Sequence, residues 1–321
     1  PSLPPLAPLP LVVGDGLLFC SGGAGGAQLR VWELPPTAAA LAASFRDPKL
    51  VCSLAAHRGA IRAIALAADG ARAATAGADG LLVLWARRQG SGAWVKEAEA
   101  DADDVAAVNS VALLHAGRPL AATGGDDAVV RVWHVEAGKG GDGGGGFVSC
   151  ALTLRGHTAA VRSVRPVWHR LASASDDGTV RLWDVLSGAP VSRLPLHAAL
   201  AAAGLETPPG APPPAACEVR LLTAGPHAGE RALCRTADGV LAVSLTAAAV
   251  RHGYRGHVVG GGAVVDRSGM QRVTAVAIDA AGGSALTAAG GWLRRWDLVG
   301  EAPTAEAATR AGEEVTALAL D

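Results

Sequence analysis

Three residues of the types that form a catalytic triad lie in one short segment of the chain. The stretch GHTAAVRSVRPVWHRLASASDDGTVRLWD, residues 156–184, contains His157, Ser173 and Asp177. A serine nucleophile needs a histidine within hydrogen-bonding reach to take its proton, and the histidine needs a carboxylate to orient it. The same residues could instead form a buried hydrogen-bonded chain that holds strands together. The choice between the two decides whether the chain is interpreted as an enzyme.

The segment is one copy of a repeat that runs along most of the 321 residues. The copies are centred on Trp32, Trp85, Trp133, Trp183, Ser244 and Trp296, and neighbouring copies lie 53, 48, 50, 61 and 52 residues apart. This period is typical of propeller blades with inserted loops. Within a copy, alternating runs separated by turn residues predict four short strands, the third of which contains the tryptophan. A lone four-stranded sheet cannot bury both faces, so we expect the sheets to stack around an axis.

Several residues recur in register with the tryptophans. Gly156-His157, the turn SDDG and Trp183-Asp184 occur together, and His57 with Asp79 and Trp85 repeats the set. Parts of the set recur as Asp127 with Trp133 and as Gly256-His257 with Trp296. On these residues the chain resembles the WD-repeat β-propeller family over nearly its whole length. The resemblance implies an all-β propeller.

The expected propeller has six four-stranded antiparallel blades, with seven as the alternative. EEVTALALD at the C-terminus has the pattern of a first strand and LLFCSGG that of a second, so we expect residues 315–321 to complete the first blade and close the ring. The expected divisions are a Pro-rich segment 1–14, blades 15–54 with 315–321, 55–99, 100–155, 156–196, 197–254 and 255–312, and inserted loops 136–147 and 198–216.

The resemblance also favours the structural interpretation of the polar residues. In this family the histidine, a second-strand hydroxyl, the turn aspartate and the third-strand tryptophan form a buried hydrogen-bonded tetrad. The predicted complete tetrads are His57, Thr75, Asp79, Trp85 and His157, Ser173, Asp177, Trp183, and the predicted partial ones contain Thr123, Asp127, Trp133, His257 and Trp296. Because the set recurs at matching offsets from the tryptophan, and an enzyme rarely needs two identical triads, we expect no catalytic residues.

Arginines cluster beside the Gly-His segments and at the starts of the first strands. They are Arg58, Arg62, Arg155, Arg162 and Arg255. The resemblance places this region on the ring face where peptides dock, and a guanidinium fork suits a carboxylate or phosphate. Ion pairing with Asp126 and Asp176 is the alternative. The preferred function is a non-enzymatic protein–protein interaction scaffold, a rigid subunit of a larger assembly. A substrate-recognition subunit of a ubiquitin ligase is the alternative, and a propeller enzyme is less favoured.

Bulk composition excludes several other classes. The formal charge is −1 with a pI near 6.9, so no global basic field exists for nucleic acid or an anionic membrane. Five cysteines without metal-ligand spacing fit reduced thiols in an intracellular, cytoplasmic protein, with an organelle or cytoskeletal assembly left open. We expect no cofactor and no metal, a solvated acidic loop around residues 97–104, and a flexible loop at 138–146. Trp94, Trp168 and Trp292 fall outside the repeat position and are expected to fill gaps between blades, with exposed binding anchors as the alternative.

Overall fold

The computed structural model describes a chain built almost entirely of β-strands. The described residues are 11–14, 16–22, 26–33, 49–55, 57–67, 69–88, 90–101, 106–115, 119–136, 146–167, 169–198, 216–221, 231–236, 239–244, 249–255, 257–258, 270–271, 273–278, 284–289, 292–297 and 304–310. Beyond residue 198, side chains are described at Val219, Cys234, Ala277, Leu286, Thr287, Ala288, Leu293 and Arg295. Most of the predicted loops 136–147 and 198–216 lies outside these residues.

Six four-stranded sheets follow one another along the described chain, and we number them 1 to 6. Sheet 1 contains β1 (Leu11–Gly14), β2 (Leu17–Gly22), β3 (Gln28–Glu33) and β4 (Lys49–Ala55). Sheet 2 contains β5 (Ile61–Leu66), β6 (Arg72–Gly77), β7 (Leu81–Arg87) and β8 (Trp94–Asp101). Sheet 3 contains β9 (Val108–His115), β10 (Pro119–Gly125), β11 (Val130–Glu136) and β12 (Phe147–Leu154).

The remaining three sheets have the same order. Sheet 4 contains β13 (Val161–Val167), β14 (Arg170–Ser175), β15 (Thr179–Asp184) and β16 (Pro190–Pro195). Sheet 5 contains β17 (Ala216–Leu221), β18 (Arg231–Thr236), β19 (Gly239–Ser244) and β20 (Ala249–Arg255). Sheet 6 contains β23 (Val273–Ile278), β24 (Ser284–Ala289), β25 (Trp292–Asp297) and β26 (Thr304–Arg310), and a two-stranded ribbon of β21 (His257–Val258) and β22 (Met270–Gln271) precedes it.

Within each of the six sheets, strands pair antiparallel with their neighbours in chain order. The predicted all-β architecture of four-stranded antiparallel sheets is therefore confirmed. The third strand of every sheet contains the repeat residue, from Trp32 in β3 to Trp296 in β25. The number of blades in the ring and its closure stay predictions.

The prediction for the first strand of sheet 1 is wrong. Leu11–Gly14, which lies within the Pro-rich segment expected over residues 1–14, forms β1 and pairs with β2 from Leu11↔Cys20 to Gly14↔Leu17. The edge of β2 that we assigned to residues 315–321 is thus occupied by a local strand, and residues 315–321 themselves lie outside the described residues. The physical reason is that a hairpin turning at Gly16, which has φ of 69°, closes a much shorter loop than a pairing between the chain ends.

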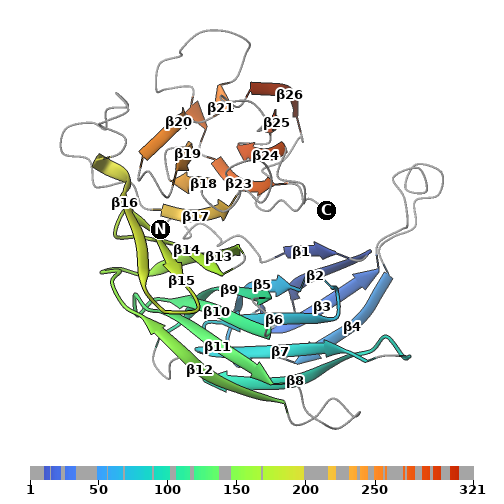
Figure 1. The fold of residues 1–321 in the computed structure, drawn as a ribbon. Coiled ribbons are helices and arrows are strands. Elements are labelled where there is room, and N and C mark those ends of the chain that lie inside the picture. The colour runs from blue at the N-terminus through green and yellow to red at the C-terminus, as the bar shows by residue number, and fades with distance from the viewer. Residues whose placement is uncertain are drawn as a thin grey trace, which may run out of the picture.

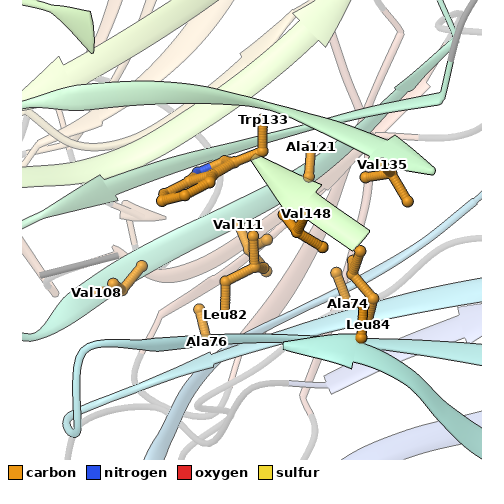
Figure 2. Close-up of a cluster of buried hydrophobic side chains, with 11 residues drawn as sticks. Ala74, Ala76, Leu82, Leu84, Val108, Val111, Ala121, Trp133, Val135 and Val148 are labelled. Atoms are coloured by element: carbon orange, nitrogen blue, oxygen red, sulfur yellow. The ribbon is translucent and has the colours of Figure 1, made fainter. Parts of the chain in front are cut away.

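Neighbouring sheets pack face to face through apolar residues that alternate along their strands. Figure 2 shows the cluster between sheets 2 and 3, where Trp133 and Val111 meet Leu82 and Leu84. In the equivalent clusters Trp183 packs toward sheet 3, and Trp85 packs toward sheet 1. Trp85, Trp133 and Trp183 therefore each face the preceding sheet, so each side chain packs against two neighbouring layers of the stack.

The first strands lie side by side toward the middle of the stack (Figure 1). Two buried serines join them across sheets: Ser110 Oγ accepts a hydrogen bond from Val164 N at 3.0 Å, and Ser163 Oγ donates to Val219 O at 3.5 Å. The approach is close enough that a Cβ on Gly124 would lie 2.5 Å from Val161 Cγ1. The central strands are thus held by both packing and polar contacts.

Trp94, outside the repeat position, fills a gap between sheets as expected. Its ring is buried and meets Phe19 of sheet 1 edge-on, with ring centroids 5.1 Å apart. Trp168 and the side chain of Trp292 lie outside the described residues. No helix in the described part of the chain has the length and apolar character needed to span a membrane.

Candidate functional site

The structure brings His157, Ser173, Asp177 and Trp183 together in sheet 4. His157 precedes β13, Ser173 lies on β14, Asp177 is in the following turn and Trp183 lies on β15. Asp177 Oδ2 is 2.9 Å from His157 Nδ1, and His157 Nε2 is 2.7 Å from Ser173 Oγ. Trp183 Nε1 donates to the same Oγ at 2.8 Å. Thr179 adds a second tie by donating its hydroxyl to Asp177 Oδ1 at 2.7 Å.

Sheet 2 repeats this geometry with a threonine. His57 Nδ1 lies 2.9 Å from Asp79 Oδ1, and His57 Nε2 lies 2.8 Å from Thr75 Oγ1. Trp85 Nε1 donates to Thr75 Oγ1 at 3.1 Å. The backbone N–H of Arg58 also donates to Asp79, at 2.8 Å, so the carboxylate joins the loop entering the sheet to the turn between its second and third strands.

The proton positions in these sets follow from the donors available. A carboxylate can only accept, so the Nδ1 that faces Asp79 or Asp177 carries the ring proton and donates it. Nε2 of the neutral ring then accepts the hydroxyl proton, while the hydroxyl oxygen accepts from the indole N–H. Ser173 and Thr75 are both fully buried. A nucleophile needs a free lone pair aimed at a substrate, and neither hydroxyl has a solvent path to one.

The pKa values of the ionisable members agree with this scheme. Burial alone would raise the pKa of Asp79 and of Asp177, but the hydrogen bonds that each carboxylate accepts outweigh it, so each pKa lies below its usual value. For His157 burial has the larger effect and holds its pKa below the ordinary value, although Asp177 acts in the opposite direction. The neutral imidazole is the favoured form.

Sheet 3 has only part of the set. Trp133 Nε1 donates to Thr123 Oγ1 at 2.9 Å, while Asp127 Oδ2 accepts from Arg131 Nη1 at 2.5 Å. The histidines of sheets 2 and 4 each stand three residues before an alanine, Ala60 or Ala160. In sheet 3 the residue three positions before the equivalent Ala107 is Asp104. Arg131 therefore takes the place of the imidazole as partner of the turn carboxylate.

In sheet 6 the hydroxyl position was missed from the sequence. In sheets 2 to 4 the hydroxyl residue of the second strand pairs with the third-strand residue two positions before the tryptophan; these hydroxyl residues are Thr75, Thr123 and Ser173. In sheet 6 the residue with the same pairing is Thr287, which is buried. Thr287 lies nine residues before Trp296 instead of ten, because the intervening turn is one residue shorter. Counting strand register instead of a fixed offset would have found it. The side chains of His257 and Trp296 lie outside the described residues.

A second repeated feature places charged side chains at the start of each first strand. In sheets 2 to 6 the pairing of the first two strands skips one residue near its beginning, which is a β-bulge. The skipped residues are Arg62, Asn109, Arg162, Cys217 and Thr274. A bulge re-aims the side chain that it carries.

The three bulge side chains that are described meet around one carboxylate. Asp126 accepts from Arg62 Nη1 at 3.2 Å, from Asn109 Nδ2 at 2.7 Å and from Arg162 Nη1 at 3.3 Å. Arg162 also donates through Nε and Nη2 to Asp176, at 2.8 and 2.5 Å. The ion pairing that we weighed as the alternative for Arg62 and Arg162 is thus present, and it links sheets 2, 3 and 4.

The remaining predicted binding residues lie beside this network or outside the description. Arg58 and Arg155 are exposed, while the side chain of Arg255 lies outside the described residues.

Burial alone would raise the pKa of Asp126, but Asn109, Arg62 and Arg162 outweigh it and hold that pKa below its usual value. The network is therefore charged at neutral pH.

One expectation about the acidic run is wrong. The sequence predicts a solvated acidic loop from Glu97 onward, but the Glu97 side chain is buried and its Oε1 accepts from Arg72 Nη2 at 3.2 Å. The reason is a second bulge: the pairing of β7 with β8 skips Glu97, whose carboxylate turns inward to Arg72. Within the described residues no group of three or more His, Cys, Asp or Glu is placed to hold a metal ion.

The stacked sheets and the repeated polar sets define a propeller-type repeat protein. The family model described as "WD domain, G-beta repeat" matches residues 48–86, 102–134 and 148–184. The chain therefore contains WD40 repeats over these three segments. Members of the WD40 repeat family are generally non-catalytic and bind other proteins.

Known relatives resemble parts of the chain. The chain is 40% identical over 76 residues to "Probable cytosolic iron-sulfur protein assembly protein Ciao1" of Culex quinquefasciatus, covering 23% of this chain and 21% of that protein. It is 33% identical over 164 residues to "Protein HIR1" of Cryptococcus neoformans, covering 43% and 17%. The chain thus spans about a fifth or less of the length of these two relatives. The crystal structure of Saccharomyces cerevisiae Sqt1 matches with a TM-score of 0.67 at 12% identity, over 98% of this chain and 78% of that one, which shows the fold alone.

Replacing the same residue type in two sheets tests the tetrad. Thr75→Val orphans both the His57 Nε2 and the Trp85 N–H, whereas Thr123→Val orphans only the Trp133 N–H. Each buried group left without a partner costs about 1–3 kcal/mol. Thr75→Val leaves one more such group than Thr123→Val, so its free energy of unfolding is expected to fall by about 1–3 kcal/mol more than that of Thr123→Val. Urea unfolding of both variants measures the difference, and equal losses would contradict the account.

Acidification is expected to destabilise the fold in two steps. The pKa of His157 is lower in the folded chain, so the unfolded chain takes up protons first and stability falls as pH drops below the unfolded value of about 6.5. Asp79 and Asp177 contribute stability that is fully present above the unfolded pKa of about 4 and is lost as pH falls through their folded values. Urea unfolding across this range measures both steps. In His157→Asn the upper step should shrink, and an unchanged step would sink its assignment.

Proposed function

We propose that the chain is a non-enzymatic protein–protein interaction scaffold, a rigid propeller subunit of a larger multi-protein assembly. The observation that carries the proposal is the fate of the residues that could do chemistry. Ser173 and Thr75 are fully buried, and each is hydrogen-bonded to a histidine on one side and a tryptophan on the other. Such a circuit fixes geometry and leaves no group free to attack a substrate.

Rigidity supports the scaffold role. The tetrads join loops to strands inside sheets 2 and 4, while the network around Asp126 joins sheets 2, 3 and 4 to one another. A surface whose shape is fixed before binding loses little conformational entropy when a partner docks. Six is the blade number that we propose, because the described residues form six four-stranded sheets.

The partner-binding residues that we propose are the arginines at the starts of the first strands and in the loops before them. Arg58 and Arg155 are exposed, and Arg62 and Arg162 keep about two-fifths of their side-chain surface in contact with solvent while paired to Asp126. Arg255 belongs to the proposed set by its place beside Gly256-His257 in the sequence. Arginine is enriched at the centres of protein interfaces because its planar fork binds carboxylates in two-point fashion.

The proposed partners are other proteins, several within one complex, with no nucleic acid, cofactor or membrane insertion. We place this complex in the cytoplasm. Cys20, Cys52, Cys150 and Cys234 are free, which fits a reducing compartment. Burial raises the pKa of Cys234 to about 12, so this thiol is inert in the fold.

Size-exclusion chromatography of native extract tests the proposal. The chain, of 32.0 kDa, is expected to elute with a much larger apparent mass and to co-purify with several proteins in fixed ratio. The double variant Arg58→Glu, Arg155→Glu should release at least one of them, because it reverses two exposed charges. Arg193→Glu on the exposed outer strand β16 is the matched control and should release none. Elution of the unmodified chain as a free monomer would overturn the proposal.

A further inference from the structure

The turn between the second and third strands has the same backbone position in sheets 2, 3 and 4. The N–H groups of residues 78, 126 and 176 donate to the carbonyl oxygens of residues 60, 107 and 160, at 2.8, 2.9 and 3.0 Å. Each of these turns follows a second strand that pairs with a bulged first strand. The Cβ atoms at positions 78, 126 and 176 are therefore equivalent places on one face of the stack.

The side chains at these equivalent places differ. In sheet 4 Asp176 accepts two hydrogen bonds from the bulge residue Arg162, and in sheet 3 Asp126 accepts one from the bulge residue Asn109. In sheet 2 the place holds Ala78, which is exposed. Sheet 2 thus has the arginine of the pair without the carboxylate.

Arg62 shows the effect of the missing carboxylate. It reaches over to sheet 3, where its Nη1 donates to Asn109 Oδ1 at 2.6 Å and to Asp126 Oδ2 at 3.2 Å. Among the described residues its Nε and Nη2 have no partner. These are the two groups with which Arg162 holds Asp176. Two-fifths of the Arg62 side chain is exposed, so the guanidinium is accessible from solution.

The unused donors of Arg62, and not an excess of positive charge, favour a carboxylate at this place. Arg62, Asp126, Arg162 and Asp176 together carry no net charge, and the exposed Arg58 is balanced by the carboxylate of Asp79, which accepts from the Arg58 backbone N–H. In sheet 4 the same two donors, Nε and Nη2 of Arg162, hold the carboxylate of Asp176. The ligand expected for Nε and Nη2 of Arg62 is therefore also a carboxylate.

We propose that the surface over Ala78 binds a carboxylate from an acidic segment of a partner protein, held by Nε and Nη2 of Arg62 with Arg58 beside it. The partner's Asp or Glu side chain would occupy the place that Asp176 occupies in sheet 4. This inference rests on the scaffold function proposed above and names the chemistry of the partner. It also explains why Ala78 differs from Asp126 and Asp176.

The decisive variant fills the place from within the chain. Ala78→Asp gives Arg62 its own-sheet carboxylate, and Ala78→Asn is the control of the same size without charge. Binding of a fluorescein-labelled hexa-aspartate peptide is measured by anisotropy at low salt, where exposed charges are least screened. A charge-assisted pair lost from the complex weakens binding about tenfold, so Ala78→Asp and Arg62→Gln should each bind about tenfold more weakly. Ala78→Asn and Arg193→Gln should stay within about threefold of the unmodified chain.

Each other outcome overturns the inference. Equal binding by Ala78→Asp and the unmodified chain, or by a hexa-asparagine peptide and hexa-aspartate, would show that no carboxylate is recognised at this place. A thermal unfolding midpoint for Ala78→Asp at or above that of the unmodified chain confirms that the variant is folded. Failure here is distinct from failure of the scaffold proposal: a carboxylate site that fails the peptide test leaves the large native complex intact, whereas a monomer in native extract removes the complex itself.

Discussion

In sheets 2 and 4 the indole N–H of the third-strand tryptophan is buried between layers, out of reach of water, and it must find an acceptor there. The acceptor is a second-strand hydroxyl, which in turn needs an acceptor for its own proton and finds it in the imidazole of the entering loop. The imidazole passes its Nδ1 proton to the turn carboxylate. Leaving any buried member unpaired costs about 1–3 kcal/mol, so a member is lost without that cost only where another group replaces it, as Arg131 does beside Asp127 in sheet 3.

The other features follow from this circuit and from stacking. A four-stranded sheet has two apolar faces, and Trp85, Trp133 and Trp183 each cover the face of the preceding sheet while the N–H is held by a hydroxyl of the same sheet. Because the carboxylate fixes the turn, the next residue toward the N-terminus, at position 78, 126 or 176, always projects on the same face. The bulges direct the first-strand side chains to that face as well. The hydrogen bonds of the buried tetrad thus determine where charged side chains lie on the surface.

The sequence was most informative where the physical chemistry is local. Both complete tetrads were predicted because the hydroxyl, carboxylate and tryptophan stand at fixed offsets along a hairpin, and strand register keeps such offsets constant. Thr287 was missed because one shorter turn changes the offset without changing the register. β1 was missed because a four-residue strand in a Pro-rich stretch has too few residues to show alternation.

Features that depend on two sheets could not be predicted in this way. The convergence of Arg62, Asn109 and Arg162 on Asp126 requires three bulges to be stacked in space, and no pattern within one repeat shows which residue is skipped. Glu97 and Arg72 both lie in sheet 2, and the inward turn of Glu97 was missed because it also depends on a bulge. Bulges change the direction of a side chain without changing the composition of the strand.

The protonation pattern of the two buried histidines tests the central claim most directly. A long-range ¹H–¹⁵N correlation spectrum of the histidine side chains at neutral pH distinguishes the two neutral tautomers and the imidazolium. The circuit predicts that Nδ1 of both His57 and His157 donates to its carboxylate while Nε2 accepts the hydroxyl proton, and that the indole N–H groups of Trp85 and Trp183 exchange slowly with solvent. A proton on Nε2 of either ring, or rapid exchange of either indole, would contradict the account.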